Sequence, residues 1–128
     1  MTDKIVFYAN PMSRGRIVQR GTYLRWFFFG AGCVEPAVVD KMLGRPPVER
    51  KGAHGYGSYE DTLRTLETAL VPGPFILGQR FSAVDVHVGS QIHWGLMTKG
   101  LEARPSFQQY ADRCAARPAL QRLTTGAV

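Results

Sequence analysis

Cysteines, acidic residues and long apolar runs are all scarce in this chain of 128 residues. The two cysteines, Cys33 and Cys114, are far apart and lack the spacing of a metal site or a redox motif, so we expect free thiols in a reducing compartment. The longest apolar run, residues 26–31, is far shorter than the ~20 residues that a membrane-spanning helix needs. No extended apolar segment follows the N-terminus, which argues against a signal peptide. We therefore expect a cytoplasmic protein that does not enter a membrane.

The excess of basic over acidic residues does not indicate a nucleic-acid-binding protein. Lys and Arg number 16 against 10 Asp and Glu, giving a formal net charge of +6. Clustered cations would favour nucleic acid, because neutralising the phosphates releases counterions. Here the cations are scattered, and no stripe of aromatic and basic residues forms a stacking platform. The sequence argues against nucleic acid as a partner, whereas a positive surface would attract a small anionic substrate.

Helical periodicity dominates the chain, which is long enough for one domain with its own core. A β-prone run at residues 4–8 ends in the turn residues Asn10-Pro11. Glycines weaken the first helix towards residue 30, and Pro36 fits the first turn of a second helix. The pattern predicts helices that start near these positions: Arg14, Val34, Ser58, Ser82, Ser106 and Pro118.

The sharpest local signal lies at residues 81–86. Ser82 and Asp85 have the spacing of a capping box, in which each side chain hydrogen-bonds the backbone N–H of the other residue. Phe81 and Val86 occupy the two positions of a hydrophobic staple around that cap. A catalytic role for Ser82 and Asp85 is the alternative, but capping alone explains the pattern.

Residues 78–85, Gly-Gln-Arg-Phe-Ser-Ala-Val-Asp, resemble the Gly-x-x-Phe-Ser/Thr-x-x-Asp segment of glutathione transferases. In that family the segment is the N-cap and staple at the heart of an all-helical C-terminal domain. The similarity continues through Trp94-Gly95 and residues 104–118, and residues 57–63 look like an earlier helix start of the same domain. Residues 4–18 look like the first strand and helix of the family's N-terminal domain, where a serine-type residue opens the helix.

The resemblance implies a mainly α fold: a glutathione transferase C-terminal-like helical bundle preceded by one remnant β-strand and helix. Residues 1–19 would be the remnant of the thioredoxin-like, glutathione-binding domain, and residues 20–128 the helical domain. The other strands of the N-terminal domain and its cis-proline turn have no counterpart in this sequence.

The resemblance also implies roles for individual side chains. Ser13 matches the hydroxyl that hydrogen-bonds the glutathione sulfur, and a helix N-terminus there favours a thiolate. The alternative is that Ser13 only caps the helix. Five further positions are candidates for substrate binding, each with a plainer alternative: Tyr8 (strand packing), Arg14 and Arg16 (solvated charge), and Tyr23 and Trp26 in the aromatic block (core or dimer burial).

No metal site and no cofactor are expected. His87, His93 and Glu102 do not share a ligand-type helical spacing, so a histidine on the surface or satisfied in the core is favoured. Glutathione would be a co-substrate, and a small hydrophobic electrophile the other. A homodimer is the expected partner state, with exchange of residues 4–8 between subunits, because one strand cannot form a sheet alone.

The sequence thus leaves two functions open. The first is a glutathione S-transferase-like enzyme in which the glutathione thiolate attacks a small hydrophobic electrophile. The second is a non-catalytic truncated helical scaffold, or dimerisation module, of the same family.

Overall fold

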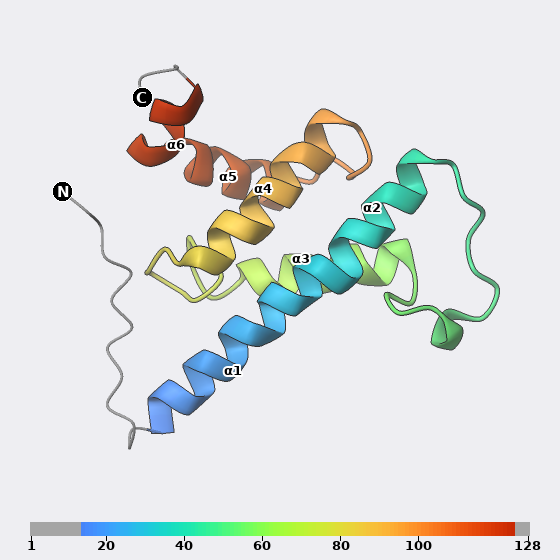
Figure 1. The fold of residues 1–128 in the computed structure, drawn as a ribbon, viewed down its shortest axis with the longest axis horizontal. Coiled ribbons are helices and arrows are strands. Elements are labelled where there is room, and N and C mark those ends of the chain that lie inside the picture. The colour runs from blue at the N-terminus through green and yellow to red at the C-terminus, as the bar shows by residue number, and fades with distance from the viewer. Residues whose placement is uncertain (1–13, 125–128) are drawn as a thin grey trace.

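The computed structural model describes residues 14–124 of the chain. These residues form an array of helices joined by loops, as Figure 1 shows. The element order is α1 (Arg14–Phe29), the π-helical turn η1 (Gly30–Val34), α2 (Glu35–Met42), the short 3-10 turn η2 (Lys51–Ala53), α3 (Tyr59–Leu70), α4 (Ala83–Met97), α5 (Pro105–Ala115) and α6 (Pro118–Thr124).

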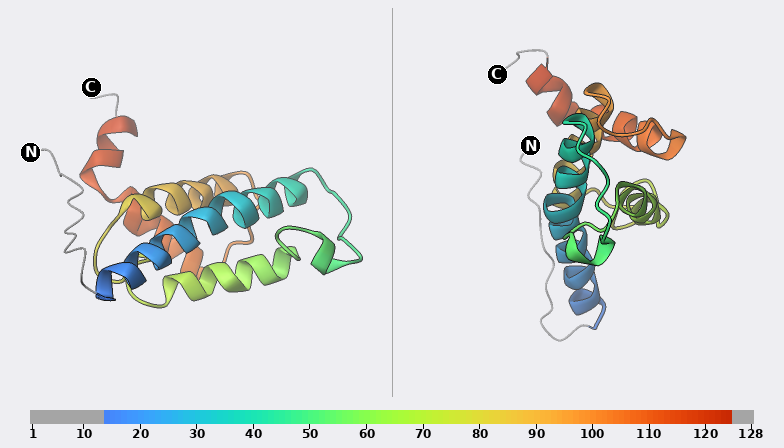
Figure 2. Two further views of the ribbon diagram at one scale, coloured as in Figure 1. Left: turned by 60° about the horizontal axis from the view of Figure 1, so that its bottom comes forward. Right: turned by 90° about the vertical axis from the view of Figure 1, so that its right-hand side faces the viewer.

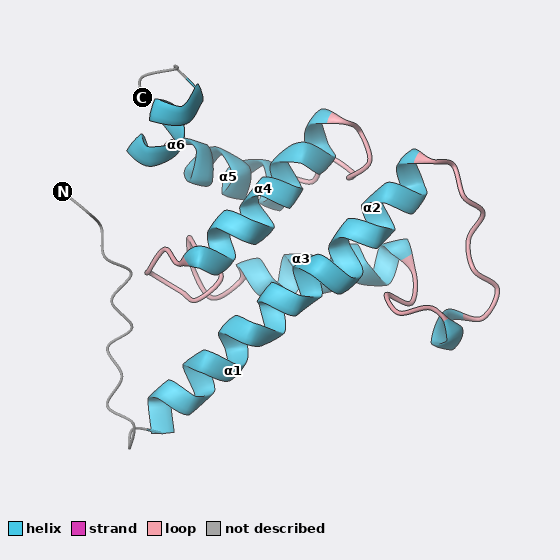
Figure 3. Ribbon diagram, viewed as in Figure 1, coloured by secondary structure: helices cyan, strands magenta, loops and turns pink. Residues whose placement is uncertain are grey.

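The described residues form no named strand; their only β feature is an isolated bridge between Phe75 and Gly78 (Figure 3). The mainly helical class expected from the sequence is therefore confirmed for this part of the chain. The strand expected at residues 4–8 lies outside the described residues, as do Tyr8 and Ser13. Within the described ranges, no helix has both the length and the apolar character to cross a membrane.

Helices α1 and α2 run as one long rod through η1, rather than as two helices separated by a break (Figure 1). The glycines near residue 30 suggested that the first helix ends there. Instead the N–H of Glu35 donates to the carbonyl of Gly30, the wider hydrogen-bond spacing of a π turn. Pro36 has no N–H to donate and its ring crowds the carbonyl four residues earlier, so an α turn is disfavoured at this point. The glycines and the proline therefore widen the helix without ending it.

Helix α3 begins where the sequence predicts a helix start, at Ser58. The side chain of Ser58 accepts a hydrogen bond from the N–H of Asp61 at 3.2 Å. Leu63, Leu66 and Ala69 then fall on one face and are fully buried. This spacing places the apolar face of α3 against η1, α2 and α5.

Helix α4 is the centre of the bundle, since it packs against α5, α1 and η1 (Figure 2). Its residues Val84, Val88 and Ile92 are at most 1% exposed. Full burial of each such side chain stabilises the fold by roughly 1.5–3 kcal/mol. The rest of the core comes from α1, η1, α2, α3, α5 and the loop residues Ile76 and Leu101. Its largest fully buried side chains are those of Tyr110, Phe107, Leu63, Leu66 and Ile76.

Candidate functional site

The cap of α4 is built around the buried carboxylate of Asp85. The reciprocal capping box with Ser82 is present, and Asp85 is 0% exposed. One carboxylate oxygen accepts the N–H and hydroxyl of Ser82, at 2.9 and 3.0 Å. The other accepts the N–H of Ile76 and the hydroxyl of Tyr110, at 2.9 and 2.8 Å. Asp85 therefore ties three separate segments together, which is a structural task and uses all of its accessible lone pairs.

The expected staple contributes little to this cap. Val86 is 58% exposed. Phe81 instead packs edge-on against Phe75, with 5.2 Å between ring centroids, and the Arg117 guanidinium lies 3.6 Å from the centroid of its ring. Phe81 is thus held by the loop before α4 and by the start of α6.

The two aromatic site candidates of α1 have different surroundings. Trp26 is 6% exposed and belongs to the core, with the Arg25 guanidinium 4.6 Å from the centroid of its ring. Tyr23 is half-buried and stacks on Phe27 at 6.0 Å. Phe27 in turn stacks on His87 of α4 at 4.4 Å. An aromatic row therefore runs from α1 onto α4. Arg14 and Arg16 lie in the first turn of α1, and the structure describes only their backbone.

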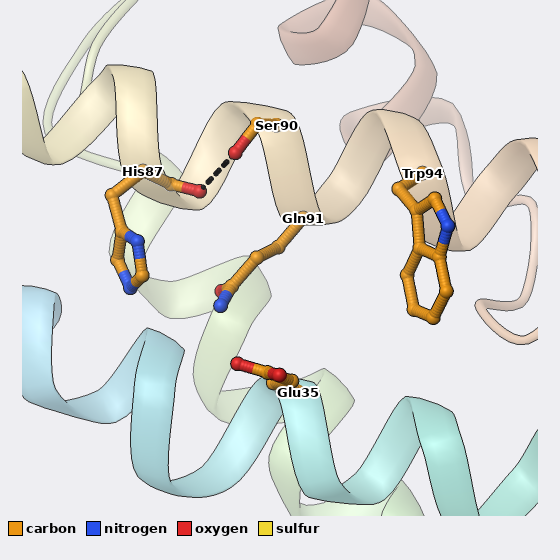
Figure 4. Close-up of a pocket in the computed structure, with 5 residues that line it drawn as sticks. All are labelled: Glu35, His87, Ser90, Gln91 and Trp94. Carbon is orange, nitrogen blue, oxygen red and sulfur yellow. Dashed lines mark hydrogen bonds between the residues drawn. The ribbon is translucent and has the colours of Figure 1, made fainter.

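An open cavity of about 420 Å³ lies at the surface between α2 and α4, close to the end of this aromatic row. Figure 4 shows the five residues that line it: Glu35 from α2, and His87, Ser90, Gln91 and Trp94 from α4. Three of these residues, Glu35, Ser90 and Trp94, are exposed, so the cavity is a surface depression and not an enclosed site. The four α4 residues share one side of that helix, because His87 and Trp94 each lie three or four residues from both Ser90 and Gln91.

Two polar atoms at this cavity are buried and without partners. The Nε2 of His87 and the Oε1 of Gln91 have no hydrogen-bond partner among the described residues. His87 is therefore neither a surface histidine nor one whose polar atoms are all satisfied in the core. The Ser90 hydroxyl, by contrast, donates to the carbonyl of His87 at 2.8 Å (Figure 4).

Gly30 lets the long rod approach these atoms closely. A Cβ at residue 30 would lie 2.9 Å from the Oε1 of Gln91 and 3.0 Å from the Nε2 of His87. Contacts this short force the neighbours to move, so a larger residue at position 30 would alter the cavity wall.

The thiols lie in positions that make them poor nucleophiles. Burial raises the pKa of Cys114 to about 11, and burial also raises the pKa of Cys33. Since the thiolate is the reactive form, neither cysteine is primed for chemistry at neutral pH. Among residues 14–124 no three His, Cys, Asp or Glu side chains gather in the arrangement of a metal site.

Sequence reasoning singled out the cap and the aromatic block, but it missed the cavity residues Glu35, Ser90 and Gln91. The available signal was the spacing of His87, Gln91 and Trp94 along one face of a helix whose opposite face is apolar. No protein-family model, curated protein or solved structure matches this chain.

Proposed function

We propose that this chain is a glutathione transferase-like protein that joins glutathione to a small hydrophobic electrophile. The observation that carries the proposal is the geometry of the α4 cap. The segment with the most specific resemblance, residues 78–85, contains a capping box with Asp85 fully buried beneath it. That is the position the resemblance implies for it, at the heart of the helical domain.

The cavity between α2 and α4 supports a binding role for the helical part. It is lined by the rings of His87 and Trp94, and Phe27 stacks on His87. Aromatic side chains beside a few polar groups are common at sites for small organic molecules. In this proposal the hydrophobic electrophile binds at this cavity, on the helical bundle.

Ser13 is the residue assigned to the sulfur in this proposal. Its hydroxyl donates to the glutathione sulfur and, with the N-terminus of α1, favours the thiolate over the thiol. The thiolate forms a bond to an electrophilic carbon, and the leaving group departs with its electron pair. With a chlorodinitrobenzene as electrophile, the products are the thioether and chloride.

Conjugation kinetics test this proposal. We expect the purified chain to accelerate the reaction of glutathione with a chlorodinitrobenzene, and Ser13→Ala to lower kcat/KM by roughly 10²–10⁴-fold, as the loss of an activating group does. Thr68→Ala is the control, because Thr68 is an exposed residue of α3 outside the cavity and its hydroxyl donates to the helix backbone at Arg64. A wild-type rate equal to that of the uncatalysed reaction would contradict the proposal.

A second function, a non-catalytic helical scaffold, is favoured by a different observation. Leu24 and Phe28 lie one helical turn apart on α1 and are 39% and 66% exposed. Apolar side chains that share an exposed helix face favour association with another protein surface. A chain that self-associates but gives no conjugation with any electrophile would favour this alternative.

A further inference from the structure

The net charge of the chain is concentrated at one end of the helical bundle. Figures 1 and 2 show that the start of α1, the loop before α4, and the end of α5 with α6 lie at this end, which we call the arginine end. Its residues 14–20, 71–84 and 112–124 contain seven arginines, no lysine and one acidic residue. Residues 21–70 and 85–111 contain eight basic and eight acidic residues, so the rest of the described chain is formally neutral.

The positive charge at the arginine end is not cancelled by neighbouring carboxylates. The salt bridges that join described side chains lie outside it, and Arg80, Arg113 and Arg117 form no ion pair with any carboxylate that the structure describes. Arg113 instead donates to the carbonyl of Pro74 at 3.1 Å, and the Arg117 guanidinium lies 3.6 Å from the centroid of the Phe81 ring. These contacts hold two guanidinium groups in place and leave their charge available to an anion.

Aliphatic side chains are exposed among these arginines. Val71, after the end of α3, is 80% exposed, and Leu120 and Leu123 of α6 are 41% and 72% exposed. Among the described residues, α6 adds no side chain to the core. A short helix gains most of its stability by burying an apolar face, so a surface that covered these leucines would stabilise α6.

The combination of arginines and aliphatic side chains favours one class of partner. Stacking on nucleic-acid bases and the hot spots of protein interfaces depend on exposed aromatic side chains. Phe75 and Phe81 are the only aromatic residues of the arginine end, and both are partly buried, with their rings edge-on to each other. The phosphate backbone of a duplex offers no apolar surface to Val71 or Leu123. An anionic bilayer offers headgroups to the arginines and an acyl boundary to the aliphatic side chains.

We propose that the arginine end binds the surface of a membrane that contains anionic lipids. The guanidinium groups bond the lipid headgroups, while Val71, Leu120 and Leu123 reach the boundary of the acyl chains. Because the arginines are scattered along the sequence, only the fold reveals this surface. The inference goes beyond the proposed function, since neither glutathione nor Ser13 takes part in it.

Co-sedimentation of the 128-residue chain with vesicles tests the class of partner. We expect vesicles of phosphatidylcholine with about 30% phosphatidylserine to be bound at least about tenfold more tightly than phosphatidylcholine alone. Added salt should weaken this binding, because it screens the charges. Equal binding to the two kinds of vesicle, or no binding to the anionic one, would overturn the proposal. Tighter binding to a duplex DNA than to anionic vesicles at the same salt would also overturn it, in favour of nucleic acid.

Paired arginine variants locate the binding surface. Arg80→Gln combined with Arg122→Gln removes two charges from exposed positions at the arginine end and is expected to weaken binding to anionic vesicles about tenfold. Arg45→Gln combined with Arg50→Gln removes the same charge from exposed positions in the loop after α2 and should have little effect. If the two double variants weaken binding equally, the net charge of the chain attracts the vesicle without a defined surface, and the proposal is wrong.

Apolar variants test the contact with the acyl boundary. Leu123→Ser is expected to weaken vesicle binding by about threefold or more, because an aliphatic side chain no longer leaves water. Met97→Ser is the control, since Met97 is 68% exposed at the end of α4, outside the arginine end. Equal effects of the two variants would contradict this contact.

The membrane proposal and the glutathione proposal can fail separately. Ser13→Ala should leave vesicle binding unchanged, whereas the Arg80 and Arg122 double variant should leave conjugation unchanged. Circular dichroism of each variant shows whether the helices are intact. A folded chain that binds vesicles without conjugating glutathione contradicts only the proposed function, and the reverse result contradicts only the membrane proposal.

Discussion

At the scale of single residues, the most consequential side chain is Asp85. It is a fully buried carboxylate, and none of the Lys and Arg side chains that the structure describes bonds it; instead four neutral donors from Ile76, Ser82 and Tyr110 surround it. The same carboxylate, together with burial, raises the pKa of the Tyr110 hydroxyl, with burial the larger cause. A buried charge is tolerated only when hydrogen bonds replace its hydration, so the cap and the core depend on each other here.

We expect Asp85→Ala to lower the free energy of unfolding by about 3–5 kcal/mol, because it leaves several buried donors without an acceptor. Tyr110→Phe, which removes one donor and leaves the carboxylate bonded, should cost only about 1 kcal/mol. Urea unfolding midpoints at constant m value measure both changes. The double variant should cost less than the sum, since the two residues share a hydrogen bond; strict additivity would contradict this account of the network.

Asp61 at the start of α3 makes stability depend on pH in a defined window. Hydrogen bonds from Ser58 and then Lys51 lower its pKa from 3.8 to about 2. A lowered folded-state pKa means that the unfolded chain binds the proton first, so this contribution is complete above about pH 4 and is lost as pH falls towards 2. Asp61→Asn should flatten the melting temperature profile between pH 4 and pH 2. An unchanged profile would show that Asp61 does not contribute to the acid sensitivity.

At the scale of elements, the sequence predicts helix starts better than helix continuity. The capping box predicted for Ser82 and Asp85 is present, and α3 starts as predicted at Ser58, which also caps its helix. Helices α5 and α6 start at Pro105 and Pro118, within one residue of the predicted starts at Ser106 and Pro118. Cap signals succeed because a cap is formed by residues that are close in sequence.

The continuity of α1 and α2 could not be predicted in the same way. Gly30, Gly32 and Pro36 individually disfavour an α-helix, and they suggest a break. The rod continues because Val34, Val38 and Trp26 are buried against other helices, a tertiary effect that local propensity does not contain. The cavity was missed for the same reason, since its two walls are far apart in sequence.

The C-terminus of α4 offers a prediction about backbone conformation. Lys99 has φ of 58°, in the left-handed region that residues with a side chain rarely adopt, and the N–H of Leu101 closes the helix on the carbonyl of Gly95 at 2.9 Å. We expect Lys99→Gly to raise the free energy of unfolding by about 0.5–1 kcal/mol, because glycine takes this conformation without strain. Thermal unfolding measures the change; a loss of stability would mean that the Lys99 side chain contributes more than its backbone strain costs.

At the scale of the whole molecule, the described helices close one continuous core while leaving apolar side chains on α1 exposed. This combination agrees with either proposed function. The proposed enzyme needs further glutathione contacts from a partner subunit to complete its site. The proposed scaffold needs an exposed surface that binds another subunit. We therefore propose that the chain self-associates, with a homodimer as the expected state.

Phe28→Ser should weaken self-association, because Phe28 is an apolar side chain that is 66% exposed on α1. Leu123→Ser is the matched control, since Leu123 is 72% exposed on α6. Sedimentation velocity over a range of concentrations gives the monomer–dimer equilibrium of each variant. If the wild-type chain is monomeric throughout, or if both variants shift the equilibrium equally, α1 is not the dimer surface.

The measurement that tests the central claim most directly is isothermal titration of the folded 128-residue chain with glutathione, alongside Ser13→Ala. The account predicts saturable binding at millimolar glutathione or below, weakened in Ser13→Ala. No binding of glutathione by a chain whose circular dichroism shows the expected helices would contradict the glutathione transferase proposal and leave a helical scaffold.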